Sequence, residues 1–137
     1  MLVIEDSEEK MDLRSLVVSA ESIAEDKLAE ALNGIFSIVE KTGEALPLPP
    51  VRKMDISTQI VGYLLALRAS VLLKYRNSAV ARPEEIAKTL GLDIRRTREA
   101  LSRLKRGFLS RVKEGYEIPL PRTMSAIEEF LKRRKSL

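Results

Sequence analysis

The chain contains neither cysteine nor histidine among its 137 residues. This absence excludes disulfides, cysteine nucleophiles, histidine general bases and every metal site built from Cys or His ligands, so an all-carboxylate site is the only metal option left. Side-chain amides are confined to Asn33, Gln59 and Asn77. Few amides beside many Lys, Glu and Arg residues are typical of proteins from thermophiles.

Long apolar runs are also missing. No stretch reaches the roughly 18 apolar residues that a membrane-spanning helix needs, and the start, MLVIEDSEEK, lacks the basic region and apolar core of a signal peptide. We therefore expect a cytoplasmic protein with no membrane partner. Neither a paired-carboxylate motif nor a phosphate loop of the GxxxxGK type occurs, so we expect neither an enzyme nor a bound cofactor.

Charge is divided unevenly along the chain. Residues 1–50 hold 4 basic and 11 acidic residues, a net charge of −7. Residues 51–137 hold 20 basic and 9 acidic residues, a net charge of +11. This asymmetry indicates two roles, and the basic part is suited to a polyanionic partner.

The acidic part predicts one long helix from Ser7 to about Thr42, with Gly43 as its stop. Its apolar residues recur at intervals of three and four, close to a heptad repeat. The helix either packs on its own domain or, as we prefer, self-associates, so residues 1–46 are predicted to be an oligomerisation element of a homodimer. The apolar seam consists of Leu13, Val17, Ala20, Ala24, Leu28, Ala31, Ile35 and Ile38.

Three prolines then interrupt the helical pattern, so residues 47–54 are predicted to be a stiff extended connector to a second domain, residues 55–137. In that domain a nearly all-apolar helix is expected from Asp55 or Ser57 to about Tyr75. A second helix is expected over residues 83–90, with Gly91 as its stop. Asp93 caps a third, over residues 94–106.

The period of the pattern changes to two after residue 107. Residues 108–118 predict a β-hairpin in which Gly115 supplies the positive φ of the turn. A last helix follows, capped by Thr123 or Ser125, with Ser125 and Glu128 as a capping box. Its terminal KRRK, residues 132–135, either complements the negative end of the helix or binds a nucleic-acid backbone. The expected fold class is mainly α with a small β-hairpin.

The helix over residues 94–106 separates charge from apolar residues. At 100° per residue, its inward face holds Leu101 together with Ile94, Thr97, Leu104 and Phe108. Four arginines share the opposite side with a single acid, Glu99, and Arg98 lies on the flank. One acid cannot neutralise this stripe, and exposed ion pairs contribute only about 0–1 kcal/mol. The stripe is either an ordinary solvated face or a binding face for an anion. The four arginines are Arg95, Arg96, Arg103 and Arg106.

The segments RPEEIAKTLGL, DIRRTREALSRL and LSRVKEGYEI follow one another in the order first helix, second helix and hairpin. Over about residues 58–118 the chain thereby resembles the winged helix-turn-helix family of DNA-binding proteins. The resemblance implies that the second segment is a recognition helix lying in the major groove of double-stranded DNA, that the hairpin is a wing, and that the protein is a transcriptional regulator.

The same resemblance implies which side chains contact DNA. Arginines and a serine of the recognition helix would reach base edges or phosphates, and two basic residues of the wing would touch the backbone or the minor groove. The alternative is a protein-interaction module that uses a winged-helix scaffold within a larger assembly. The DNA-binding residues expected are Arg95, Arg96, Arg98, Ser102, Arg103, Arg106, Arg111 and Lys113.

Overall fold

Five helices and two short β-hairpins make up the part of the chain that the computed structural model describes, which is residues 20–136 without residue 114. The mainly helical class with a small β-hairpin is therefore confirmed, and a second hairpin was not expected. The elements are α2 (Ala20–Leu32), β1 (Phe36–Ile38), β2 (Ala45–Pro47), a 3-10 helix η1 (Pro49–Lys53), α3 (Ile56–Leu72), α4 (Pro83–Leu90), α5 (Ile94–Leu104), β3 (Ser110–Val112), β4 (Gly115–Glu117) and α6 (Leu120–Lys135).

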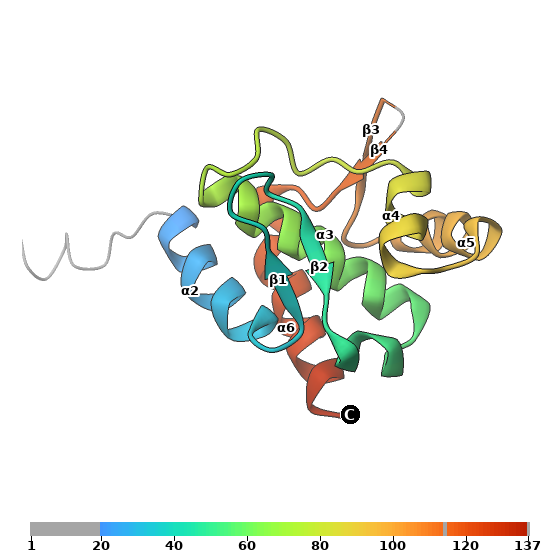
Figure 1. The fold of residues 1–137 in the computed structure, drawn as a ribbon, viewed down its shortest axis with the longest axis horizontal. Helices are drawn as coiled ribbons and strands as arrows, with labels where there is room; N and C mark the ends of the chain where they lie inside the picture. Colours follow the sequence, from blue (N-terminus) through green and yellow to red (C-terminus); the bar gives the residue numbers. More distant parts are fainter. Residues whose placement is uncertain (1–19, 114, 137) are drawn as a thin grey trace, which may run out of the picture.

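Helix α3 lies at the centre of the fold, with α2 on one side and α4 and α5 on the other (Figure 1). It also contacts α6 and both strands of the first hairpin, and every residue from Thr58 to Leu67 is buried. This confirms the expectation that the all-apolar helix is the most buried one. Its N-cap is Asp55, one of the two starting residues that the sequence offered, and it ends at Leu72 rather than near Tyr75. Of the helices within the described ranges, including this one, none combines the length and apolar character that crossing a membrane requires.

The two helices that follow α3 begin where their sequence signals predict. Helix α4 starts with Pro83 in its first turn and ends at Gly91, whose φ of 69° places it in the left-handed region. Helix α5 is capped by Asp93, whose carboxylate accepts a hydrogen bond from the Arg96 backbone N–H at 3.0 Å. It ends at Leu104 rather than at residue 106.

The predicted long N-terminal helix is wrong from residue 33 onward. Helix α2 ends at Leu32, where Asn33 and Gly34 form a turn and Gly34 adopts a φ of 78°. Strand β1 then pairs antiparallel with β2, with Phe36 opposite Pro47 and Ile38 opposite Ala45. The expected start of the helix and the first half of its apolar seam lie outside the described residues.

The described part of the apolar seam packs within the chain. Leu28, Ala31 and Ile35 are buried in the same core as α3 and α6. The α6 residue Arg134 donates hydrogen bonds to the carbonyl oxygens of Glu30 and Ala31, both at 2.9 Å, and so satisfies the C-terminal carbonyls of α2. Residues from both sides of the expected boundary after residue 46 therefore share one core.

The predicted extended connector, residues 47–54, is also wrong. Pro47 belongs to β2, and residues 49–53 form η1, whose Val51 is buried against the core. Proline fixes φ near the value that the first turn of a helix needs, so Pro49 and Pro50 begin this short helix instead of excluding one.

Helix α6 begins at Leu120, three residues or more before the caps that the sequence suggested. Thr123, Ser125 and Glu128 therefore lie inside the helix, and neither the cap nor the capping box exists. Pro121 stands in the first turn, a position that tolerates proline because the first amides of a helix have no intrahelical partner. The hydroxyl of Thr123 donates back to the Pro119 carbonyl at 3.1 Å.

Gly115 of the second hairpin and Ile94 of α5 also differ from expectation. The turn of the hairpin takes positive φ at Lys113, 54°, and not at Gly115. Gly115 is needed for close packing, because a Cβ atom there would lie 3.0 Å from the Ala81 carbonyl oxygen. Ile94, expected on the inward face of α5, stands in the first turn of the helix and is 37% exposed.

These burials predict how two apolar residues of α5 differ in their contribution to stability. Leu101 is fully buried and Ile94 is not. We expect Leu101→Ala to lower the free energy of unfolding by about 2–5 kcal/mol and Ile94→Ala by less than about 1 kcal/mol, measured by urea denaturation. Equal losses would show that α5 is rotated about its axis relative to this structure.

Candidate nucleic-acid interface

All eight side chains predicted to contact DNA are exposed. Six come from α5 and the turn that follows it, and two come from the β3–β4 hairpin. The opposite face of α5 is buried against α3 and α4: Thr97, Ala100 and Leu101 are each 0% exposed. The exposed residues are Arg95, Arg96, Arg98, Ser102, Arg103, Arg106, Arg111 and Lys113.

In the part of the chain that the structure describes, most of these cations have no anionic partner. Within the described residues, only Arg98 of the seven basic side chains makes a side-chain ion pair, donating from Nη2 to Glu84 Oε2 at 2.6 Å. That hydrogen bond from Arg98 is the main reason why the pKa of Glu84 lies below its ordinary value. Glu99 within α5 and Asp93 at its N-cap are further exposed acids. The face is therefore strongly cationic and can bind anions.

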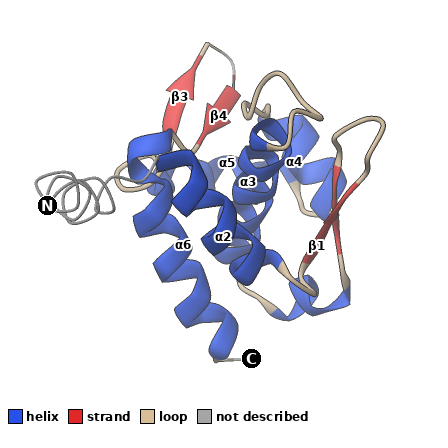
Figure 2. Ribbon diagram, turned by 90° about the vertical axis from the view of Figure 1, so that its left-hand side faces the viewer, coloured by secondary structure: helices blue, strands red, loops and turns tan. Residues whose placement is uncertain are grey.

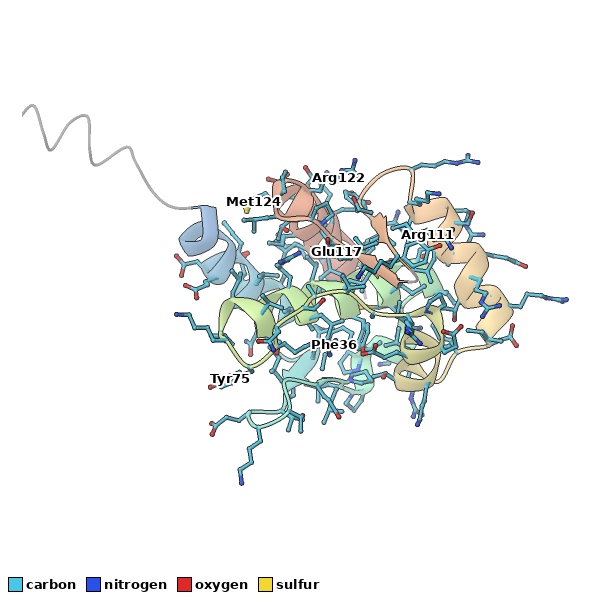
Figure 3. All side chains as sticks on the ribbon, turned by 90° about the horizontal axis from the view of Figure 1, so that it is seen from above. Phe36, Tyr75, Arg111, Glu117, Arg122 and Met124 are labelled. Carbon is cyan, nitrogen blue, oxygen red and sulfur yellow. The ribbon has the colours of Figure 1, made fainter. Side chains whose placement is uncertain are left out.

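The start of α4, the middle of α5 and the second hairpin converge on one concavity of about 580 Å³. Arg98 and Arg111 both line it, so the structure brings together one predicted residue from the helix and one from the hairpin. Arg111 lies beside α5 in the view from above (Figure 3). Lys113 borders a second concavity together with Val80 and Glu85, and Arg82 lines both. The first concavity is lined by Arg82, Pro83, Glu84, Arg98, Arg111 and Tyr116.

The β3–β4 hairpin projects from the helices (Figure 2) and is held at its base by the main chain before α4. Ser110 pairs with Glu117 and Val112 with Gly115 in an antiparallel register. Ala81 exchanges two backbone hydrogen bonds with Tyr116, of 2.9 and 2.8 Å, so a single residue extends the hairpin as a third strand. The segment before α4 and the hairpin are therefore coupled through their backbones.

A second anchor of the hairpin comes from the central helix. Arg68 of α3 donates from Nη2 to Glu117 Oε1 at 2.9 Å and to the Ile118 carbonyl at 3.1 Å. The side chains of this ion pair are only 15% and 24% exposed, so water screens it less than a surface pair. The remaining Nε of Arg68 is buried and has no partner within the described residues.

Helix α4 is joined to α3 through Tyr63. This side chain is 2% exposed and its hydroxyl donates to Glu85 Oε2 at 3.1 Å, while Arg76 Nη1 lies 3.6 Å from the same oxygen. Burial, followed by the charge of Glu85, raises the pKa of Tyr63 to about 12. The tyrosine therefore stays a neutral donor at physiological pH, and α4 keeps a fixed position on α3.

Sequence reasoning missed the residues that position the hairpin. Ala81 and Tyr116 have no sequence signal, because a single backbone bridge depends only on the tertiary fold. Arg68 did have one: it is the only charged residue of a helix that is otherwise apolar or uncharged. A charge at such a position is rarely left without a partner.

Arg68 provides a test of hairpin anchoring. Arg68→Met keeps the aliphatic stem but leaves Glu117 and the Ile118 carbonyl without their donor, so we expect a loss of about 1–3 kcal/mol in unfolding free energy and faster exchange of the Tyr116 amide proton. Arg133→Met is the control, because the Arg133–Glu129 pair is an exposed i,i+4 contact that contributes about 0.3–0.5 kcal/mol. Urea denaturation measures the loss of unfolding free energy, and hydrogen exchange measures the rate at the Tyr116 amide. If Arg68→Met and Arg133→Met change these two quantities equally, Arg68 does not anchor the hairpin.

No protein-family model matches the chain, and comparisons with curated proteins and with solved structures found no match either. The described residues also hold no group of three or more acidic side chains that could bind a metal ion. The cationic face and its surroundings are therefore the features of the molecule that bear on its function.

Proposed function

We propose that residues 56–118 form a winged helix-turn-helix unit that binds double-stranded DNA and acts in transcription regulation. In this proposal α4 and α5 are the helix-turn-helix pair, with α5 in the major groove, and the β3–β4 hairpin is the wing. The order of the elements supports it, as do the short turn between α4 and α5 and the bridge that adds Ala81 to the hairpin as a third strand.

The observation that carries the proposal is the unneutralised arginine face of α5. A short amphipathic helix can enter the major groove, and guanidinium groups there donate to guanine O6 and N7 or to phosphate oxygens. Exposed cations this close together repel each other, and DNA phosphates relieve that repulsion while counterions are released. Arg111 and Lys113 would then contact the backbone or the minor groove beside the same site.

The proposal includes a homodimer, in which two recognition helices would meet successive major grooves about 34 Å apart. Leu28, Ala31 and Ile35 are buried within the chain, so contacts between copies would come from other residues of the predicted oligomerisation element, residues 1–46. Acidic residues on that element would lie away from the DNA, because α2 and α5 are at opposite ends of α3 (Figure 1).

A triple substitution tests the position of the DNA site. Arg95→Ala, Arg96→Ala and Arg103→Ala together should weaken binding to duplex DNA by at least about tenfold and flatten its dependence on salt, because phosphate and base contacts are lost. The control removes the same three charges from the end of α6, as Lys132→Ala, Arg133→Ala and Lys135→Ala. Fluorescence anisotropy at several salt concentrations measures both.

The α6 control should bind duplex DNA with an affinity within about threefold of that of the unmodified protein. The three charges that it lacks would act on DNA only through screened long-range electrostatics. If both triple variants lose affinity equally, net charge and not the α5 face determines binding. If only the control loses affinity, the terminal basic run is the DNA site. Unchanged thermal melting of the α5 variant, whose three residues are exposed, separates loss of binding from loss of fold.

Glu84 provides an independent test of the same face. Its carboxylate holds Arg98 at 2.6 Å in the free protein, so DNA has to compete with it. We expect Glu84→Gln to raise DNA affinity about two- to fivefold. The slope of log affinity against log salt concentration should steepen by about the amount expected for one additional phosphate contact. Glu129→Gln, which breaks the exposed Glu129–Arg133 pair on α6 and changes the net charge equally, should have less than half this effect. An equal gain in both variants would show that Arg98 makes no DNA contact.

A further inference from the structure

An apolar groove of about 860 Å³ runs between α2, strand β1 and the end of α3. It lies at the α2 end of the molecule, away from the arginine face. Figure 3 shows this separation: Tyr75, which follows the end of α3, lies near one end of the molecule, and Arg111 lies toward the other. The groove is lined by Glu25, Leu28, Ala29, Glu30, Leu32, Asn33, Gly34, Phe36, Ser37, Ile38, Leu48, Ala69, Leu72 and Leu73.

Several of the groove's apolar side chains remain open to water. Leu73 is 50% exposed, the highest value among the large apolar side chains described, and Ile38, Leu48 and Leu72 are half-buried beside it. A single exposed leucine on a surface is ordinary, whereas aliphatic side chains gathered along one groove are typical of an interaction surface. Covering hydrophobic surface of this kind with a partner removes it from water, which favours association.

The charge of the groove limits what that partner can be. Among the residues that the structure describes, Glu25 and Glu30, both exposed on α2, are the only charged ones that line it, and the rest of this lining is apolar or uncharged. A protein with a net charge of +4 thus carries an acidic rim at this one groove. The rim repels nucleic acid and favours a cationic partner.

The N-terminal segment of the chain does not fit this rim. Residues 1–19 contain five acidic and two basic residues, a net charge of −3, which has the same sign as the rim. A helix with leucine-like residues on one face and lysine or arginine on its flank meets both requirements, because its apolar face would cover the aliphatic lining while its cations approach Glu25 and Glu30.

We propose that this groove binds a basic amphipathic helix of a partner protein. Apolar anchors at i, i+3 or i+4, and i+7 of that helix lie on Leu72, Leu73 and Ile38, and its basic residues pair with Glu25 and Glu30. Because the groove and the arginine face lie at opposite ends, one chain can hold this partner and a polyanion at the same time. The interaction does not depend on the DNA-binding proposal.

Anisotropy of a labelled synthetic peptide tests the groove in the full-length protein. The probe is a helical peptide with leucine at i, i+3, i+4 and i+7 and lysine at the other positions, compared with the same peptide carrying glutamate for lysine. We expect saturable binding of the lysine peptide and about tenfold weaker binding of the glutamate peptide. Leu73→Glu should weaken the lysine peptide about tenfold, because it places a charge against an apolar anchor.

Matched variants separate the groove from general surface effects. Leu46→Glu alters an equally prominent leucine, 44% exposed, that does not line the groove, and it should change affinity less than twofold. Glu25→Gln with Glu30→Gln should weaken the lysine peptide, whereas Glu40→Gln with Glu44→Gln, two exposed acids outside the groove, should not. These four residues are exposed, so the comparison holds even if Leu73→Glu fails to fold.

Four outcomes would overturn the proposal. The first is absence of saturable binding of the lysine peptide, and the second is equal loss in Leu46→Glu and Leu73→Glu. The third is light scattering that shows a dimer of the unmodified protein and a monomer of Leu73→Glu, because a second copy then occupies the groove. The fourth is a large gain in peptide affinity on deleting residues 1–19, because the chain's own segment then occupies it.

Discussion

The burial of one face of α5 is the constraint on which the rest of this structure depends. Thr97, Ala100 and Leu101 are fully enclosed against the neighbouring helices, and burying a single leucine contributes about 2–3 kcal/mol. Turning the helix would expose these residues and bring guanidinium groups into the core, at several kcal/mol for each ion. The rotation of α5 is therefore fixed, and the arginines can only face water or a ligand.

The surroundings of α5 keep that face accessible and add to it. Asp93 caps the helix without covering it, and the pairing of Ala81 with Tyr116 and of Arg68 with Glu117 holds a basic hairpin alongside. Acidic residues are concentrated on α2, at the other end of α3. The arginine face and the acid-rimmed apolar groove thus lie at opposite ends of the central helix, while the basic end of α6 reaches the acidic α2 through Arg134.

The parts of the fold that could be predicted are those whose signals lie within a few residues. Pro83, Gly91 and Asp93 mark the ends of α4 and α5 by local backbone chemistry, and the apolar composition of α3 marks its burial. The exposure of the arginines followed from helical spacing alone. Their accessibility could be predicted because the free-energy cost of burying an unpaired guanidinium exceeds the free energy gained from packing its side chain.

The parts that could not be predicted depend on contacts between distant residues. The apolar spacing of α2 continues through Ile35 and Ile38, so the sequence of strand β1 resembled further turns of helix. Strands β1 and β2 have only three residues each and pack on α3, a contact that the local sequence does not reveal. The turn residues Asn33 and Gly34 were the local signal against that reading. Gly115 was predicted to supply the positive φ of the turn. A glycine is needed there instead because the backbone of Ala81, more than thirty residues earlier in the chain, lies too close for a side chain.

The central claim is that DNA lies on α5 and the hairpin, and hydrogen exchange with and without a short duplex tests it most directly. We expect slower exchange in the first turns of α5, at the start of α4 and in β3–β4 when DNA is bound, with exchange in α2 and α6 unchanged. Slower exchange confined to α2 or α6, or no change in any segment at DNA concentrations that saturate binding, would contradict it.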